Sequence, residues 1–247
     1  MGRKLNNILL GALVMFGTSC FSQEDDTKPP KVNNYKSDSS FINFDNLRFT
    51  VARAQITLLK DSGALLVRLK TNANTIKRLK AAGNIDLATQ VERETLINNK
   101  VMMRAYRNEF TFCPVYFFTS DYSDSVKHNN LSGIFVDSNI VVDQGIVCKS
   151  AFYLIAEQGS IYESSIGFVT QEQAVKAVER GASSKEVSIV LKNRYFIQLH
   201  KPFPYFQQGY SIKKFADHVK KFNANLLEFY KKNTPYTIPP EVMPFVY

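Results

Sequence analysis

The 247 residues of the chain, of which 45% are hydrophobic, are enough to bury a substantial core. No internal repeat, composition shift or long polar linker divides residues 41–247, which excludes a repeat architecture and favours a single domain. Lys and Arg number 31 against 22 Asp and Glu, a formal charge of +9. We expect these charges to lie mainly on solvated helix faces, although anionic lipid, acidic polysaccharide or nucleic acid would also attract a basic protein.

Residues 1–22 have the pattern of a signal peptide. Arg3 and Lys4 form a positive start, an apolar run covers residues 8–16, and small residues follow up to Ser22. The apolar run is shorter than the about 20 residues that a membrane-spanning helix needs. The sequence therefore predicts export, and removal of this segment leaves a mature charge of about +7.

Two ways of processing this signal remain open. Cleavage after Ser22 would release a soluble protein, whereas cleavage before Cys20 would leave an acylated N-terminal cysteine. Residues 17–20, Gly-Thr-Ser-Cys, resemble a bacterial lipobox, with Gly where the pattern usually has Leu. The segment that follows, Gln23-Glu-Asp-Asp26, resembles the acidic signal that sends some lipoproteins to the outer-membrane surface. Residues 23–40 are polar and predict a flexible tether.

The first ordered elements are expected from about Phe41 onward. Residues 55–60 and 64–70 flank a short Asp-Ser-Gly connection, which predicts an antiparallel hairpin. The apolar spacing then changes to three and four, which predicts helices over residues 72–82 and 84–109.

Residues 110–121 form the most apolar and aromatic run of the mature chain. Its uncharged first nine residues predict a strand buried on both faces, and we expect it to be the central strand of the sheet. Because a helical crossover separates it from the preceding strand, the two should be parallel neighbours.

The rest of the chain alternates short strands, turns and two further helices. Strands are predicted at 133–136, 139–142, 151–156, 161–169, 186–191 and 195–200, helices at 170–181 and 211–231, and an extended tail at 236–247. The fold class is therefore mixed α/β (α+β). We predict a single domain over residues 41–247, with a mixed parallel and antiparallel sheet of about six to eight strands covered by helices 72–109 and 211–231.

Two cysteines remain after the signal, Cys113 and Cys148. Export permits a disulfide between them. Each also lies in an apolar or β-rich context, where a free cysteine is a common small core residue, so both states remain open.

Acidic residues follow two of the predicted strands. Asp121 and Asp137 end their strands, and in open α/β sheets ligands bind outside the carboxyl ends of the strands. If the two strands are parallel neighbours, these carboxylates could share a cleft with Asp124, His128 and Asp143, as acid/base catalysis or a divalent cation would need. Asp and Ser are also common in turns and caps, and that structural interpretation is favoured.

Other catalytic or cofactor-binding signals are missing from the sequence. His200 closes a predicted strand and His218 lies on the basic face of the last helix, but no histidines stand at metal-ligand spacing. Neither Gly-x-Ser-x-Gly nor a glycine-rich phosphate loop occurs, so we predict no cofactor.

Aromatic residues cluster near the C-terminal third. Phe203, Tyr205, Phe206 and Tyr210, with Phe245 and Tyr247 in the tail, could form an exposed platform for a glycan, a peptide or a partner protein. Aromatics spaced by prolines more often close the end of a core, which is the favoured interpretation.

Residues 65–118 resemble exported proteins of Gram-negative bacteria, and this resemblance implies no activity. We therefore expect an exported protein of the periplasm, outer membrane or cell surface, most simply a non-catalytic binding domain for an envelope protein, a glycan or a small ligand. No specific nucleic acid partner is predicted, and the membrane is reached only through the lipid anchor, if Cys20 is acylated. The alternative is a hydrolase that uses Asp121, Asp124 and Asp137, with or without a divalent cation.

Overall fold

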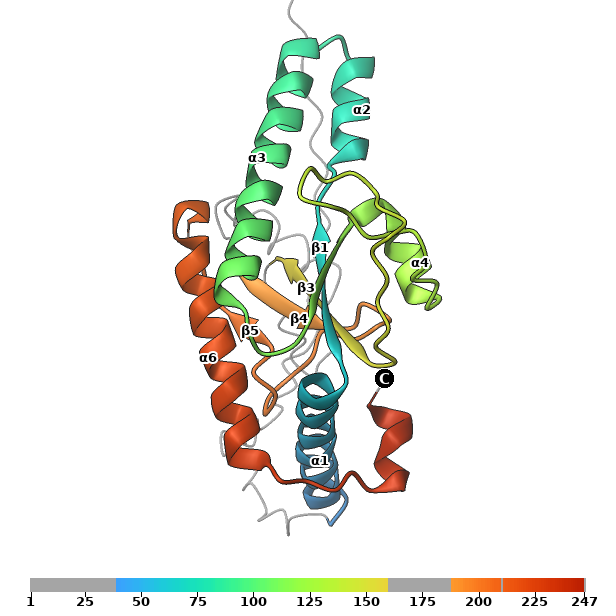
Figure 1. Ribbon diagram of the computed structural model, residues 1–247, viewed down its shortest axis with the longest axis vertical. Helices are drawn as coiled ribbons and strands as arrows, with labels where there is room; N and C mark the ends of the chain where they lie inside the picture. Colours follow the sequence, from blue (N-terminus) through green and yellow to red (C-terminus); the bar gives the residue numbers. More distant parts are fainter. Residues whose placement is uncertain (1–38, 160–187, 210, 247) are drawn as a thin grey trace, which may run out of the picture. The chain divides into compact units, whose positions relative to one another are not determined.

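The chain folds around a mixed sheet whose strand order is β2-β1-β3-β4-β5 (Figure 1). A computed structural model describes residues 39–159, 188–209 and 211–246. The five strands in that part of the chain are β1 (Ala64–Leu69), β2 (Val115–Thr119), β3 (Tyr153–Gln158), β4 (Ile189–Lys192) and β5 (Phe206–Gln207). The mixed sheet and its helical cover confirm the predicted class, while five strands are fewer than the six to eight expected.

The parallel part of the sheet is centred on β1. Strands β2 and β3 both pair with β1 in parallel, and five of its six residues are buried. The predicted parallel pairing of β1 with β2 is therefore confirmed. The prediction that β2 is the central strand is wrong, because it lies at the edge of the sheet. Its outer side is shielded by a bridge between Phe118 and Phe135, which explains why an edge strand is so apolar.

One face of the sheet is covered by three long helices: α1 (Ser39–Asp61), α3 (Ile85–Glu109) and α6 (Phe215–Asn233). Helix α6 confirms the last predicted helix, and Ser211 caps the short 3₁₀ helix η2 (Ile212–Lys214) that precedes it. Helix α1 contradicts the predicted strand at residues 55–60. Ala52, Ile56 and Leu59 are buried, at the three- and four-residue spacing of a helix. Because the helix is buried on several sides, the apolar residues of this segment are not confined to one helical face, and such a sequence is also typical of a buried strand.

The turn from α1 into β1 depends on Gly63. A methyl group built on this glycine would lie 2.6 Å from the Leu59 Cα atom and 2.8 Å from the Leu58 carbonyl oxygen. Because both contacts are with helix backbone, the turn itself would have to move. We expect Gly63→Ala to lower the free energy of unfolding by about 2 kcal/mol in urea titrations.

The matched control is Gly159→Ala, whose added methyl would meet nothing closer than 3.8 Å. It should change the free energy of unfolding by less than about 0.5 kcal/mol. Equal effects of the two substitutions would contradict the helix-to-strand junction seen at Gly63.

The second face of the sheet is covered by a non-repetitive segment. After β2 come the 3₁₀ helix η1 (Ser120–Tyr122) and the short helix α4 (Ser123–Lys127). Residues 133–143 then form only isolated bridges, Phe118 to Phe135 and Val136 to Val142, rather than the two predicted strands. The Asp137 carboxylate accepts hydrogen bonds from the backbone of Asn139 and Val141, so the chain curls into a turn before a ladder can extend.

The antiparallel part of the sheet also differs from prediction. Strand β3 confirms the predicted 151–156 strand and β4 the predicted 186–191 strand, whereas residues 195–200 contribute only a bridge between Lys192 and Gln198. The Asn193 side chain accepts hydrogen bonds from the Tyr195 and Ile197 backbone, which coils this segment away from β4. The predicted strand at 161–169 and helix at 170–181 lie outside the described residues.

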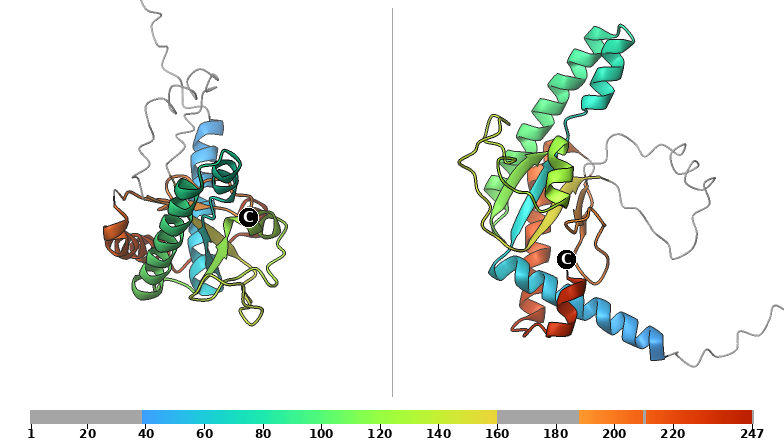
Figure 2. Two further views of the ribbon diagram at one scale, coloured as in Figure 1. Left: turned by 90° about the horizontal axis from the view of Figure 1, so that it is seen from above. Right: turned by 90° about the vertical axis from the view of Figure 1, so that its right-hand side faces the viewer.

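Helices α2 (Ala73–Ala81) and α3 form a helical hairpin that extends beyond the sheet (Figure 2). They confirm the two predicted helices, and Gly83 links them in a left-handed conformation with φ of 77°. Helix α2 has no buried residue. No helix in the described part of the chain is both long and apolar enough to cross a membrane.

The C-terminal tail is not simply extended. Residues Pro240–Phe245 form the 3₁₀ helix η3, and Val242 and Val246 are buried against α1. A proline in the first turn of a helix costs no hydrogen bond, because the N–H group at that position has no partner within the helix. Pro240 therefore does not prevent the 3₁₀ helix, and the predicted extended tail is wrong at residues 240–245.

Cys113 and Cys148 are both free thiols and pack into the separate hydrophobic clusters on the two faces of the sheet. The disulfide alternative is therefore not realised in this structure. Burial raises the pKa of the Cys113 thiol to about 12, and burial also raises that of Cys148.

We expect Cys113 to react slowly with a disulfide reagent at pH 8. A pKa near 12 lowers its thiolate fraction by two to three orders of magnitude, roughly, relative to an unperturbed thiol. Reaction rates of the folded Cys20→Ser/Cys148→Ser variant, which leaves Cys113 as its one cysteine, are compared with those of the same variant in guanidinium chloride. Equal rates in the two conditions would show that the thiol is not buried.

Candidate functional site

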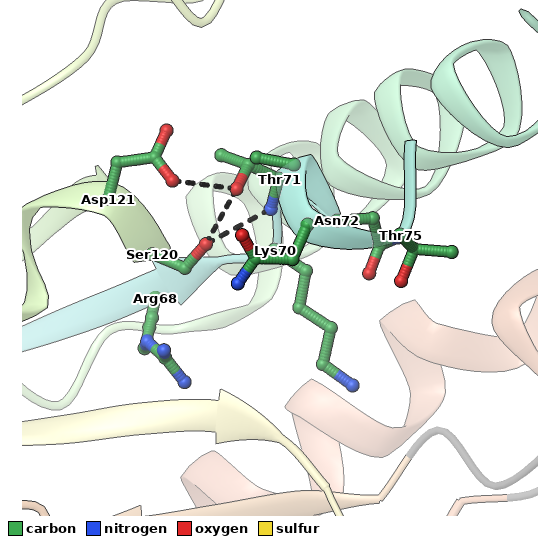
Figure 3. Close-up of a pocket in the computed structure, with 9 residues that line it drawn as sticks. Arg68, Lys70, Thr71, Asn72, Thr75, Ser120 and Asp121 are labelled. Atoms are coloured by element: carbon green, nitrogen blue, oxygen red, sulfur yellow. Dashed lines mark hydrogen bonds between the residues drawn. The ribbon is translucent and has the colours of Figure 1, made fainter. Parts of the chain in front are cut away.

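A polar cleft of about 390 Å³ opens at the carboxyl ends of β1 and β2. Three segments form it: the end of β1, the first turn of α2, and the residues directly after β2 (Figure 3). Its lining consists of Arg68, Lys70, Thr71, Asn72, Ala73, Asn74, Thr75, Ser120 and Asp121. Ala73 is the one apolar residue of this set, so the cleft suits a charged or strongly polar ligand.

Hydrogen bonds hold the two strand ends together at this cleft. The Thr71 backbone N–H donates to Ser120 Oγ at 3.1 Å, and the Thr71 hydroxyl donates to Asp121 Oδ1 at 2.8 Å. The Ser123 hydroxyl donates to the Ser120 carbonyl oxygen at 2.5 Å. The Asp121 carboxylate is therefore already engaged in fixing the loop.

Lys70 is a cation of the cleft that finds no partner among the described residues. Within the described residues its Nζ atom has no hydrogen bond or ion pair, and Figure 3 shows the side chain extending away from the Thr71, Ser120 and Asp121 contacts. Lys70 is exposed when its whole surface is counted, but neighbouring residues partly shield its ammonium group from water. This desolvation lowers the Lys70 pKa; nearby Glu157 opposes the effect, and Arg68 and Lys192 add to it.

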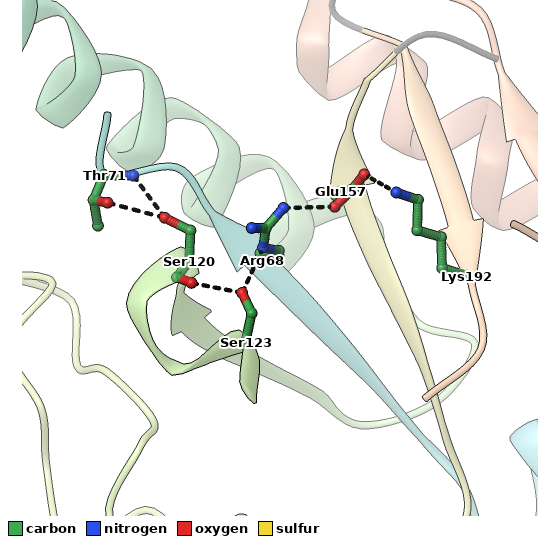
Figure 4. A network of polar contacts seen from close by, with 6 residues as sticks. All are labelled: Arg68, Thr71, Ser120, Ser123, Glu157 and Lys192. Atoms are coloured by element: carbon green, nitrogen blue, oxygen red, sulfur yellow. Dashed lines mark hydrogen bonds and ion pairs between the residues drawn. The ribbon is translucent and has the colours of Figure 1, made fainter. Parts of the chain in front are cut away.

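Beside Lys70, a polar network crosses three strands of the sheet (Figure 4). Arg68 Nη1 on β1 donates to Glu157 Oε2 on β3 at 3.0 Å, and Lys192 on β4 forms an ion pair with the other oxygen of the same carboxylate. Arg68 Nε also donates to Ser123 Oγ at 2.9 Å. One carboxylate thus serves two cations, which leaves a positive excess next to the cleft.

The first turn of α2 adds backbone donors. Asn72 has a left-handed conformation with φ of 52°, and its side-chain amide donates to Thr95 Oγ1 at 2.7 Å instead of capping the helix. The free N–H groups at a helix start carry partial positive charge. The open end of α2 therefore reinforces the positive potential of Lys70.

A second, smaller pocket of about 120 Å³ adjoins the cleft and shares Lys70 and Asn72 with it. Its other lining residues are Val91, Glu94, Thr95, Asn98, Asn99 and Gln158. The Asn99 side-chain amide donates to the Lys70 carbonyl oxygen at 2.8 Å and so fixes the end of β1. The pocket thus combines three asparagine side chains and one glutamine side chain with the Glu94 carboxylate, whose Oε1 atom accepts a hydrogen bond from Gln90 at 2.8 Å.

Comparison of the chain with protein-family models, with curated proteins and with solved structures finds no match in any of the three.

The structure separates most of the carboxylates that the sequence grouped. Of the predicted set, only Asp121 lines the cleft. Asp137 and Asp143 accept backbone hydrogen bonds within their own turns, and those from Val141 and Asn139 lower the Asp137 pKa. His128 Nδ1 lies 2.7 Å from the Asp124 carbonyl oxygen. The described residues hold no group of three or more acidic, histidine or cysteine side chains that could bind a metal ion.

The predicted aromatic platform is divided between core and surface. Phe203 is buried and packs against Phe229 with ring centroids 5.9 Å apart, whereas Phe245 is exposed. Tyr205 and Phe206 are half-buried, and Tyr205 packs against the core cluster beneath α6. Tyr210, Tyr247 and the acylation candidate Cys20 lie outside the described residues.

The two remaining histidines lie away from the cleft. His200 follows the β4 region and its ring lies 6.0 Å from that of Tyr205. His218 lines a depression of about 540 Å³ on α6 together with three lysines and Asp217, and desolvation lowers its pKa. Neither histidine contributes to the strand-end cleft.

Sequence reasoning missed Arg68 and Lys70. The available signal was an apolar strand that ends in two basic residues at alternate positions, followed by Thr71 and Asn72. Alternate residues of a strand share a face, so this spacing already places both cations on one side of the strand end.

Proposed function

We propose that this chain is a binding domain that takes a small anionic ligand in the strand-end cleft. The observation that carries the proposal is the Lys70 ammonium group, which has no partner among the described residues although the cleft walls desolvate it. An unpaired charge in a desolvated position is unfavourable, and a bound anion would offset that penalty.

The charge balance around the cleft supports an anion over a cation. Arg68 and Lys192 share the single carboxylate of Glu157, and Asp121 is engaged by the Thr71 hydroxyl. Arg68, Lys70 and Lys192 thus face two carboxylates, Glu157 and Asp121, so one positive charge remains in excess around the cleft. The uncapped start of α2 contributes partial positive charge from the same side.

The composition of the cleft favours binding over catalysis. Asp121 is the one carboxylate in its lining, which contains no histidine or cysteine. General acid/base or nucleophilic catalysis usually combines such groups at hydrogen-bonding distance. We further propose that the domain works outside the cytoplasm, in the periplasm or at the outer membrane, and the support for this location is the sequence of residues 1–26.

Lys70→Met tests the proposal. Calorimetric or NMR titrations with inorganic phosphate and acetate should show saturable binding to the native protein and at least tenfold weaker binding to the variant. The affinity should also fall as the pH rises, because Lys70 loses its charge on deprotonation. Since the Lys70 pKa is lowered, this fall should begin at a lower pH than it would for an ordinary lysine, whose pKa is 10.5. Absence of binding, or equal binding to both proteins, would contradict the proposal.

Two controls separate charge from folding. Lys70→Arg retains the cation, and Lys80→Met removes a lysine that pairs with Glu92 on the distant part of the hairpin. The second variant should bind as the native protein does. A lowered Lys70 pKa means that folding disfavours its charged form, so Lys70→Met should not lower the melting temperature at pH 7.

A further inference from the structure

The second pocket indicates what kind of molecule bears the anionic group. We propose that the ligand is a sugar that carries a carboxylate or a phosphate, an inference that rests on the anion-binding function proposed above. The acidic group would lie against Lys70, and the hydroxyl groups would extend past Asn72 into the amide-rich pocket. The two cavities share these two residues, so one molecule can contact both.

The lining of the second pocket matches the chemistry of hydroxyl groups. Amide side chains offer both donors and acceptors, as a sugar hydroxyl does. Among the described residues, the amides of Asn98 and Gln158 make no hydrogen bond that fixes them, whereas Asn99 is engaged by the Lys70 carbonyl oxygen. Glu94 and Thr95 also lie at the pocket wall, where Glu94 Oε1 accepts from Gln90 and Thr95 Oγ1 accepts from Asn72, so the two unengaged amides are the groups that a hydroxyl would meet.

The same lining argues against other classes of anion. Val91 is the one apolar residue of the second pocket and Ala73 the one of the cleft, and neither lining contains an aromatic side chain. A nucleotide base or a fatty acyl chain would find no stacking surface or apolar wall. A simple inorganic anion would leave the amides of the second pocket unused. A polyhydroxylated acid uses both halves of the site.

The experiment compares ligands that differ in one feature at a time. Titration with glucuronate, galacturonate and mannuronate covers three arrangements of the hydroxyls, and glucose 6-phosphate replaces the carboxylate by phosphate. Glucose lacks the acid, while acetate and inorganic phosphate lack the hydroxyls. We expect at least one sugar acid to bind ten times more tightly than the simple anion with the same acidic group, and more tightly than glucose by a similar factor.

Variants locate the effect within the site. The double variant Asn98→Ala/Gln158→Ala should lower the affinity for the sugar acid toward that for the simple anion, and Lys70→Met should abolish it. Asn225→Ala removes an amide on α6 that contacts Gln207 instead, and it should leave binding unchanged. Melting temperatures establish that each variant is folded.

The possible failures can be told apart. If acetate or phosphate binds as tightly as every sugar acid, the sugar inference is overturned and the anion-binding function stands. If glucose binds as tightly as the sugar acids, or if neither the sugar acids nor acetate and phosphate bind, both are overturned. A preference for glucose 6-phosphate over all hexuronates, or the reverse, identifies the acidic group that the cleft recognises.

Discussion

Phe222→Ala is expected to lower the free energy of unfolding by about 4 kcal/mol, as deletion of a fully buried aromatic ring does. Phe222 has no solvent exposure, and its ring stacks on Phe110 with centroids 5.9 Å apart. The pair joins α6 to the C-terminal end of α3. Nearby, Asn223 on α6 accepts a hydrogen bond from the Thr111 backbone, so the helix has little freedom to close the cavity.

Urea titration followed by circular dichroism measures this effect. In a domain of this size, a loss of that magnitude corresponds to a fall in melting temperature of roughly 8–16 °C. Phe245→Ala is the matched control, because its ring is 57% exposed, and it should change the free energy by less than about 0.5 kcal/mol. A loss below about 1 kcal/mol for Phe222→Ala would mean that α6 does not pack on the sheet as described.

The same packing explains which elements could be predicted from the sequence. Helices α3 and α6 span 25 and 19 residues, so the apolar spacing of one face repeats over several turns. A helix can be predicted from the spacing of its apolar residues when it buries one face and exposes the other. Helix α1 has no such single buried face, since Ala54, Ile56 and Thr57 are all buried as it contacts the sheet, α6 and the tail.

The misplacement of β2 has a different physical origin. The apolar and aromatic side chains of β2 correctly indicated burial on both faces, since Phe117 and Phe118 lie in the clusters on opposite sides of the sheet. Burial of the faces does not determine whether a strand has one neighbour or two. The coverage of its free edge comes from Phe135, in a segment that local periodicity assigned to an independent strand.

The site was only half predictable for a related reason. The expectation of a ligand site at the strand ends, with Asp121 beside it, follows from general properties of parallel sheets. The network around Arg68 depends on Glu157, which lies 89 positions further along the chain. Strand order brings these residues together, and strand order is not visible in a local pattern.

Glu157→Gln is expected to change stability and ligand binding in opposite directions. The substitution retains the shape of the side chain but removes the charge that pairs with Arg68 and Lys192. The Glu157 and Lys192 side chains are each 13% exposed, and Arg68 is 28% exposed. Removing one member of a buried ion pair costs about 3–5 kcal/mol, and because these groups are partly solvated we expect a loss of about 2–3 kcal/mol.

A double-mutant cycle tests whether the loss arises from the ion pair. Glu157→Gln/Lys192→Met removes the carboxylate together with one of its two cations, so it should be more stable than the sum of the two single variants predicts. A coupling energy of about 1 kcal/mol or more is expected, and additive effects would show that the contact between Glu157 and Lys192 contributes nothing to the fold.

Binding supplies the second measurement. The charge of Glu157 acts to raise the Lys70 pKa against the larger effect of desolvation, and it competes electrostatically with any anion in the cleft. At pH 7, the Glu157→Gln protein should therefore bind inorganic phosphate several-fold more tightly than the native protein, although it is less stable. Weaker phosphate binding by the folded variant would mean that Glu157 positions the binding groups, and that the positive excess around Lys70 does not determine affinity.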